Sequence, residues 1–214
     1  MHDSLTNIAI AWTSDLEDFH QELENAVLKC AHVFPGCRFH IIGITGLSSE
    51  STTADNILRT TVHMNRNLGW TISSFDALTK LHEVSRRDCD HAYNHIIFFT
   101  RQVISRFHHN SPFDSCSHEN ALISLAFCRN LIDLENVAAL MLKHAIGHFY
   151  ISTVTEAHCH QKDCSMSPMY SHRHIYELAE HEQNPNLDSF CPDCVRTLVD
   201  SPLWKTSPSI VIKR

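Results

Sequence analysis

Hydrophobic and polar positions follow two recurring patterns along the chain. Short apolar runs bounded by turn-forming residues are typical of buried β-strands, and longer stretches with apolar residues three or four positions apart are typical of amphipathic helices. The predicted strands are residues 8–12, 39–45, 95–100 and 121–127. The predicted helices are residues 15–34, 54–67, 75–91, 134–150, 172–180 and 192–198, and polar loops are expected at 48–53 and 106–120.

The order of these elements predicts the fold class. Strands alternate with helices first, and a helical region rich in cysteine and histidine follows. Such an order favours an α/β (α+β) domain with a mixed sheet. We expect an α/β part over residues 1–150, which includes the longest helix of the second half, and a small C-terminal subdomain over 151–214. The two parts are expected to form one compact unit.

Composition and charge narrow the class of protein. A chain of 214 residues with 43% hydrophobic content can bury the core of one domain. The formal net charge of -7 and the lack of a long Lys or Arg run argue against nucleic acid or an anionic membrane as partner. No apolar run approaches the roughly 20 residues of a membrane helix, and the polar N-terminus has no secretory signal pattern. We therefore expect a cytoplasmic monomer.

Histidine and cysteine are out of proportion, with 18 and 9 residues. An odd cysteine number in a chain without a signal argues against a disulfide framework, and clustered Cys and His in a reducing compartment indicate metal. Five cysteines are scattered and are interpreted as small buried hydrophobic residues: Cys30, Cys37, Cys89, Cys116 and Cys128. Four lie together in the last quarter: Cys159, Cys164, Cys191 and Cys194.

The four clustered cysteines have the number and spacing of a structural zinc site. Cys191 and Cys194 form a CxxC pair at the start of a predicted helix, and Cys159 and Cys164 precede them. Four thiolates close a tetrahedral zinc site. A redox role for the CxxC pair remains an alternative, but it expects a preceding strand in a thioredoxin-like unit, and none is predicted. Unligated thiols are the third interpretation.

One histidine pair falls on the predicted helix 134–150. His144 and His148 lie four positions apart, which puts both imidazoles on one helix face within reach of one ion. With this histidine content, chance alone gives about 1.5 such pairs. A second pair, His91 and His95, indeed occurs without a further ligand. The spacing of His144 and His148 therefore does not by itself predict a site.

The order of the whole set carries more information. The chain has His-x3-His, then His-Cys-x4-Cys-x-Met, then Cys-x2-Cys, an order that resembles the motif of the archaemetzincin (archaelysin) zinc metallopeptidases. Residues 121–126 resemble the strand before the active-site helix of that family, and the first strand, long helix and second strand match its layout. The resemblance is specific from about residue 121 to residue 194 and loose over the rest of the chain.

The resemblance implies a metzincin-like zincin domain with a twisted mixed sheet, an active-site helix, a small zinc-bound C-terminal subdomain and two zinc ions. It also implies a peptide or protein segment in a cleft as partner. By the same resemblance, Met166 lies in the Met-turn beneath the histidines, although an ordinary core methionine fills almost the same role. The implied ligands are His144, His148 and His158 for a catalytic-type zinc, and Cys159, Cys164, Cys191 and Cys194 for a structural zinc.

Ala145 is the largest departure from the family pattern, because it stands where the family has the glutamate of HExxH. That glutamate moves the protons of the reaction, a contribution commonly worth about 10²–10⁴-fold. The departure predicts inactive or severely impaired hydrolysis. Two explanations are open: the natural protein is a pseudo-peptidase, or a glutamate has been replaced deliberately. Glu156 is a candidate substitute base.

The loop after the helix also departs from the family. Ile151 stands where the family has a glycine, and Val154 where it has the third histidine. His158 comes later, which implies a short insertion. The adjacency of His158 to Cys159 favours it as the third ligand, and His160 is the alternative.

Two hypotheses of different classes follow. The first is an archaemetzincin-like metallopeptidase with impaired hydrolysis, and the alternative is a non-enzymatic binding module stapled by zinc. A zinc hydrolase that uses another base is a third. Residues 102–114 lack the apolar and aromatic segment that lines the family's substrate cleft, which argues against the usual extended mode of peptide binding.

Overall fold

The computed structural model describes residues 5–43, 58–65, 69–73, 75–80, 83, 93–105, 113–117, 119–128, 131–150, 158–169, 171–180, 189–200 and 209–212. Packing divides the chain into two compact units. The first comprises Met1–Asn7, Gln21–Phe39 and Cys128–Val211, and the second comprises Ile8–His20, His40–Phe127 and Ile212–Arg214. The residues expected to bind metal all belong to the first unit. The division of the chain at residue 150 stays a prediction.

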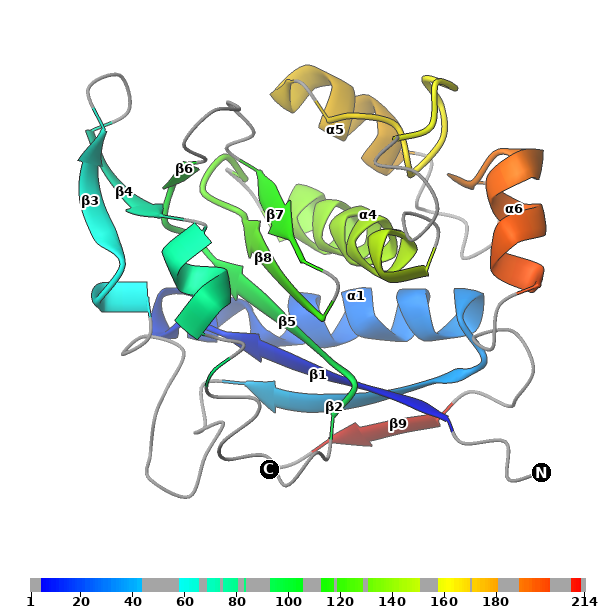
Figure 1. The fold of residues 1–214 in the computed structure, drawn as a ribbon, viewed down its shortest axis with the longest axis horizontal. Coiled ribbons are helices and arrows are strands. Elements are labelled where there is room, and N and C mark those ends of the chain that lie inside the picture. The colour runs from blue at the N-terminus through cyan, green and yellow to red at the C-terminus, as the bar shows by residue number, and fades with distance from the viewer. Residues whose placement is uncertain are drawn as a thin grey trace. The chain divides into compact units, whose positions relative to one another are not determined.

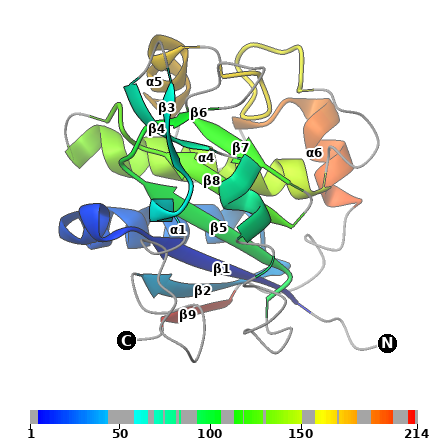
Figure 2. The same ribbon diagram turned by 60° about the vertical axis from the view of Figure 1, so that its left-hand side comes forward.

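The main sheet is mixed, as expected. Its six strands are hydrogen-bonded in the order β7-β8-β5-β1-β2-β9 (Figures 1 and 2). Strands β1 and β8 pair with β5 in parallel, and β7 pairs with β8 antiparallel. Parallel strands covered on both faces read as continuous apolar runs, which explains why they were predictable. The strands are β1 (Thr6–Trp12), β2 (Cys37–Gly43), β5 (His95–Thr100), β7 (Asp114–Cys116), β8 (Asn120–Ser124) and β9 (Ser209–Ile212).

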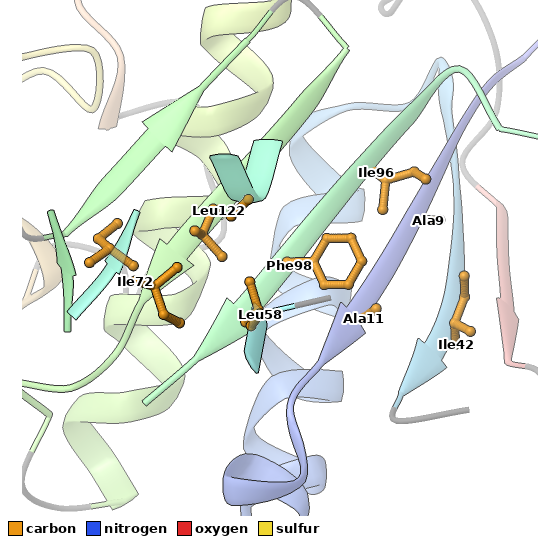
Figure 3. Close-up of a cluster of buried hydrophobic side chains, with 10 residues drawn as sticks. Ala9, Ala11, Ile42, Leu58, Ile72, Ile96, Phe98 and Leu122 are labelled. Atoms are coloured by element: carbon orange, nitrogen blue, oxygen red, sulfur yellow. The ribbon is translucent and has the colours of Figure 1, made fainter. Parts of the chain in front are cut away.

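The core of the second unit depends on small and large side chains in register. Ala9 and Ala11 of β1 lie opposite Ile96 and Phe98 of β5. All four are buried in one cluster together with Leu122 of β8 (Figure 3). The two alanines leave room for the larger side chains of the neighbouring strand, which is how interdigitated cores reach high packing density.

A second sheet corrects the helix predicted over residues 54–67. Strands β3 (Val62–Asn65), β4 (Gly69–Ser73) and β6 (Ile104–Ser105) form a three-stranded sheet, with β3 and β4 antiparallel. The helix prediction is wrong over β3, where side chains alternate between two faces: Val62 and Met64 are exposed, and His63 contacts Ser105. The apolar residues Leu58, Val62 and Met64 are spaced by four and by two, which fits the helical period as well as the strand period. Pairing with β4 makes residues 62–65 a strand.

Other element ends differ from the predictions. The strand predicted over 121–127 is shorter, because β8 ends at Ser124 and leaves Leu125 to Phe127 outside it. The backbone N–H of Leu125 donates to the Thr100 carbonyl, past the end of the strand. The expected loop 106–120 contains β7, a polar three-residue strand defined by backbone pairing alone. Strand β9 was not predicted. The predicted loop 48–53 lies outside the described residues.

The helices also begin differently from the predictions. The segment predicted as one helix over 15–34 is a 3-10 helix η1 (Ser14–Phe19) followed by α1 (His20–Val33), and of the helix predicted over 75–91 the described residues 75–80 and 83 are helical. The helix expected at 134–150 starts earlier, as α4 (Leu131–Tyr150). Helices α5 (His172–Glu180) and α6 (Pro192–Val199) lie close to their predicted positions.

Helix α4 is anchored to α1 by a polar contact within the first unit. Lys29 Nζ of α1 lies 2.5 Å from a carboxylate oxygen of Glu135, and Asn25 donates to the same carboxylate at 3.0 Å. Burial alone raises the pKa of Glu135, but the hydrogen bonds from Lys29 and Asn25 and the charge of Lys29 lower it below its ordinary value. Helix α5 packs against α4 as well. These contacts fix the helix that carries the candidate site.

None of the helices in the described part of the chain has both the length and the apolar composition to cross a membrane.

Candidate metal centres

Three histidines of the first unit converge on one point. His144 and His148 lie one turn apart on α4, and their Nε2 atoms are 2.9 Å apart. The ring of His158 lies 5.3 Å from that of His144 and 4.8 Å from that of His148, measured between centroids. One ring nitrogen from each histidine lies within 4.8 Å of the others. We call these three residues the histidine triad.

The orientation of His144 is fixed by its other ring nitrogen. His144 Nδ1 lies 2.6 Å from the Ser165 carbonyl oxygen, and the imidazole is buried. Because a carbonyl oxygen can only accept, the proton is on Nδ1 and donates to it. The lone pair is therefore on Nε2, the atom that faces His148. Histidines that bind metals are commonly held by such a hydrogen bond to a backbone carbonyl.

Met166 packs directly against α4 at Gly147. A Cβ atom at position 147 would lie 2.1 Å from the Met166 sulfur, so only glycine leaves room for this contact. The Cys159 N–H donates to the Met166 carbonyl at 2.8 Å. The segment that follows the third histidine is thereby held against the helix that carries the first two. Gly147 was missed from the sequence, although a glycine inside a helix, where it costs stability, is a usable signal.

Four thiols form the second group, which we call the cysteine cluster: Cys159, Cys164, Cys191 and Cys194. Their sulfurs lie within 4.8 Å of one another and form no disulfide, and Cys159 Sγ is 3.4 Å from Cys191 Sγ. Cys191 is the N-cap residue of α6, and Pro192 follows it at the start of the helix. Cys194 therefore lies in the first helical turn, where the helix dipole favours a thiolate.

Backbone N–H groups point at the sulfurs. The N–H of Met166 donates to Cys164 Sγ at 3.4 Å, and that of Cys191 donates to the same sulfur at 3.3 Å. The N–H of Gln161 donates to Cys159 Sγ at 3.4 Å. Hydrogen bonds of this kind stabilise the ionised form of a thiol.

The cysteine cluster titrates unevenly. Burial, and then the charges of Cys191 and Cys159, raise the pKa of Cys164 to about 11, against hydrogen bonds that lower it. Burial and the charge of Cys164 also raise the pKa of Cys194. Burial raises the pKa of Cys191 too, but hydrogen bonds from Cys194 and Cys159 outweigh it and lower the pKa. Thiolates this close repel one another, and a cation among them removes that obstacle.

Other residues singled out from the sequence lie elsewhere. His160 is exposed and belongs to neither group. His95 begins strand β5, and burial lowers its pKa to about 4. Cys30, Cys37 and Cys128 are buried as predicted, and Cys116 is half-buried. The remaining positions are outside the described residues: Cys89, His91, residues 106–112, Ile151, Val154 and Glu156.

Two solved structures share the fold of this chain. The archaemetzincin of Methanopyrus kandleri matches with a TM-score of 0.55 and 16% sequence identity, over 92% of this chain and 96% of that one. The archaemetzincin of Archaeoglobus fulgidus, crystallised with malonate, matches with a TM-score of 0.53 and 15% identity, over 90% and 99% of the two chains. This chain has the archaemetzincin fold. No protein-family model and no curated protein matches the sequence, so the likeness rests on structure.

On the archaemetzincin fold, the two groups are donor sets suited to two zinc ions. Zn–N bonds of about 2.0–2.1 Å put tetrahedral nitrogen ligands roughly 3.3 Å apart, and Zn–S bonds of about 2.3 Å put sulfurs roughly 3.8 Å apart. The distances of 2.9 Å in the histidine triad and 3.4 Å in the cysteine cluster are close to these values. Three imidazoles leave a fourth position open, whereas four thiolates close the site.

Position 145 offers no acid or base to the histidine triad. Ala145 is completely buried beside His144, and neither metal group contains a carboxylate in the part of the chain that the structure describes. Three further residues around the triad were missed from the sequence: Lys143, Ser165 and Ser189. The serines carry no sequence signal, but a lysine among the apolar positions of α4 could have been noticed.

Proposed function

We propose that this chain is an archaemetzincin-like zinc protein of metallopeptidase type whose hydrolytic step is inactive or severely impaired. In this proposal His144, His148 and His158 hold one zinc, and Cys159, Cys164, Cys191 and Cys194 hold the other. The observation that supports it most is the convergence of three imidazoles, one of them oriented by the Ser165 carbonyl.

The chemistry divides between the metal and the chain. A zinc in the histidine triad would supply a Lewis acid and an acidified water. The chain orients the ligands through Ser165 and through the packing of Met166 on α4. It lacks a proton acceptor at Ala145, a loss commonly worth about 10²–10⁴-fold. A peptide segment would then be held without being cut.

Further parts of the proposal rest on the sequence. The formal net charge of -7 argues against nucleic acid or an anionic membrane as partner and leaves the peptide or protein segment that the family resemblance implies. The sequence is also the basis on which we propose a cytoplasmic location and a monomeric state.

Replacing Ala145 with Glu tests the proposal, and Ala145→Gln is the matched control. Both side chains add nearly the same volume at a completely buried position, so both meet the same packing cost. Only the glutamate can exchange a proton. We expect Ala145→Glu to cleave a quenched fluorescent peptide library at least about 10²-fold faster than wild type, and Ala145→Gln to remain at the wild-type rate.

Two results would contradict the proposal in different ways. Peptide cleavage by wild type at the rate of Ala145→Glu would show that Ala145 does not impair hydrolysis. Equal inactivity of both variants, with two zinc ions still bound per chain, would favour the non-enzymatic binding module. The complete burial of Ala145 is the observation that favours this second function, because a side chain at 145 has no contact with solvent.

Metal analysis tests the zinc assignment separately. We expect two equivalents of zinc per chain. One equivalent that is lost on Cys191→Ser and unaffected by His144→Ala would remove the histidine site from the proposal.

A further inference from the structure

A lysine lies fully buried in α4 directly before the first histidine of the triad. Lys143 has no exposed surface and is among the largest fully buried side chains of the chain. Lysine is rarely buried to this extent unless polar partners hold its ammonium group. Its Nζ donates to the hydroxyl of Ser189 at 3.3 Å.

Hydrogen bonds connect Ser189 back to the histidine triad. The Ser189 carbonyl accepts a bond of 2.6 Å from the N–H of Ser165. The Ser165 carbonyl in turn accepts the bond of 2.6 Å from His144 Nδ1. Because Lys143 and His144 are neighbours on α4, these three hydrogen bonds connect Lys143, Ser189, Ser165 and His144 in a closed loop, which we call the ring. Ser165 is thus held on one side by Ser189 and on the other by the imidazole.

The same two serines flank ligands of the cysteine cluster. Ser165 follows Cys164 directly, and Ser189 lies two residues before Cys191. The N–H of Cys191 donates to Cys164 Sγ at 3.3 Å, which joins the two segments a second time. The carbonyl that orients His144 therefore belongs to one backbone segment of the cysteine cluster, and Lys143 contacts the other segment through the Ser189 hydroxyl.

We propose that Lys143 is a positioning residue that acts through Ser189 and Ser165 to hold His144 with its proton on Nδ1 and its Nε2 lone pair facing the other histidines. The consequence for zinc affinity rests on the proposed function, because it takes His144 as a ligand. The consequence for the imidazole proton does not, because it concerns the protein without an ion in the triad.

Two variants break the ring at either end of one contact. Lys143→Met removes the donor and keeps an unbranched apolar stem, and Ser189→Ala removes the acceptor. Ser189→Thr keeps the hydroxyl and serves as the conservative variant. Two controls are used. Ser165→Ala removes a buried hydroxyl that makes no hydrogen bond among the described residues while leaving both backbone contacts, and Lys80→Met removes a lysine of the second unit that donates to Thr60, whereas the histidine triad belongs to the first unit.

The first measurement is the tautomer of His144, read from imidazole ¹⁵N shifts of the full chain at about pH 8, above the ordinary histidine pKa. The His144 signal is assigned by its loss in His144→Gln. We expect one Nδ1–H tautomer in wild type, Ser189→Thr and both controls, and a mixture in Lys143→Met and Ser189→Ala. A protein that merely loses stability keeps the wild-type tautomer in its folded fraction.

The second measurement is zinc affinity by competition with a chelator. Outer partners of ligating histidines are commonly worth 10–100-fold in affinity, so we expect a loss of roughly that size in Lys143→Met and Ser189→Ala, and none in the controls. A single Nδ1–H tautomer in both ring-breaking variants overturns the proposal. If wild type binds no zinc in the triad, the proposed function fails, while the tautomer measurement still decides the role of Lys143. Should Lys143→Met fail to fold, Ser189→Ala and Ser189→Thr carry the test.

Discussion

The histidine triad and the cysteine cluster differ in what holds them in place. Two of the three histidines project from α4, a helix of 20 residues that is anchored to α1 by Lys29 and packs against α5. The cysteines lie on short segments that are joined by a backbone hydrogen bond from Ser165 to Ser189 and by contacts that involve sulfur, from the Cys191 N–H to Cys164 Sγ and between Cys159 Sγ and Cys191 Sγ. The helix can form without a metal, whereas the cysteine segments are held largely through their thiols. A zinc ion should therefore stabilise the fold at the cluster and serve another purpose at the triad.

The charge of the ligands and the number of ligands lead to the same distinction between the histidine triad and the cysteine cluster. Three neutral imidazoles leave an open position and the full charge of an ion available, which is the arrangement of catalytic zinc sites. Four thiolates more than neutralise the ion and fill its coordination shell, as in structural sites. His158 and Cys159 are neighbours in the sequence, so the two groups meet at a single peptide bond.

The largest effect should come from the cysteine cluster. We expect Cys164→Ser to release one zinc ion and to destabilise the fold by several kcal/mol, because a structural metal contributes folding free energy directly. For a chain of this length that corresponds to a fall in Tm of roughly 10 °C or more. Calorimetry with metal analysis checks this, with Cys116→Ser, a half-buried thiol outside the cluster, as the control. An unchanged Tm after loss of the ion would erase the contrast between the two groups.

The histidine triad should respond in the opposite way. We expect His148→Ala to weaken zinc binding at the triad by more than about 100-fold, beyond the 10–100-fold of outer partners. Its Tm in the absence of triad zinc should stay within roughly 4 °C of wild type, because α4 does not depend on the ion. Chelator competition and calorimetry on the same samples provide both values. His160→Ala, at an exposed position outside the triad, is the control. Loss of the cluster zinc in His148→Ala would instead mean that the two groups bind as one.

A smaller effect is expected at the contact between Met166 and α4. In Gly147→Ala the new Cβ would lie 2.1 Å from the Met166 sulfur, so one of them has to move. Overpacking of this kind costs about 1–3 kcal/mol, and it should reduce zinc affinity at the triad more than at the cluster. Denaturant unfolding measures the first effect and chelator competition the second. The double variant Gly147→Ala with Met166→Ala should show less than the sum of the single losses, and full additivity would contradict the contact.

The smallest expected effect concerns His95 and the loss of folding stability at acid pH, which can be measured apart from the release of zinc by acid. His95 belongs to the second unit, and burial lowers its pKa from 6.5 to about 4. Between these values the unfolded chain binds the proton and the folded chain does not, so stability falls as the pH falls from about 6.5 to 4. We expect His95→Asn to flatten the profile, because the asparagine side chain does not titrate.

The measurement is urea unfolding at several pH values in wild type and His95→Asn, with the exposed His32→Asn as control. Both variants keep every predicted zinc ligand, so metal release affects them alike and cancels in the comparison. A slope unchanged in His95→Asn would assign the acid sensitivity to other groups.

The two His-x3-His pairs show how far the sequence could go. Spacing alone could not distinguish His144 and His148 from His91 and His95, because the two histidines are four positions apart in both pairs. The order of the motif favoured His144 and His148, and His95 proves to be the first residue of the buried strand β5. The apolar runs of β1, β5 and β8 were predictable because burial on both faces leaves a continuous hydrophobic pattern.

What could not be predicted depends on pairing between distant segments. Residues 62–65 carry apolar positions that suit a helix and a strand equally, and pairing with β4 made them a strand. The three residues of β7 have no pattern of their own and exist only as a partner of β8. The ring that Lys143, Ser189, Ser165 and His144 form joins positions up to 46 residues apart through one hydroxyl and two backbone carbonyls, and no periodic pattern in the sequence encodes these contacts.

The contact between Met166 and Gly147 also bears on oxidation chemistry. Conversion of the thioether to a sulfoxide adds an oxygen and a strong dipole to a side chain that is buried against the bare backbone of α4. Burial protects this sulfur as long as the segment stays packed on the helix. A methionine sulfoxide, formed by a peroxide while the sulfur was exposed, would no longer fit against Gly147, and the histidine triad would lose this support until the thioether was reduced again.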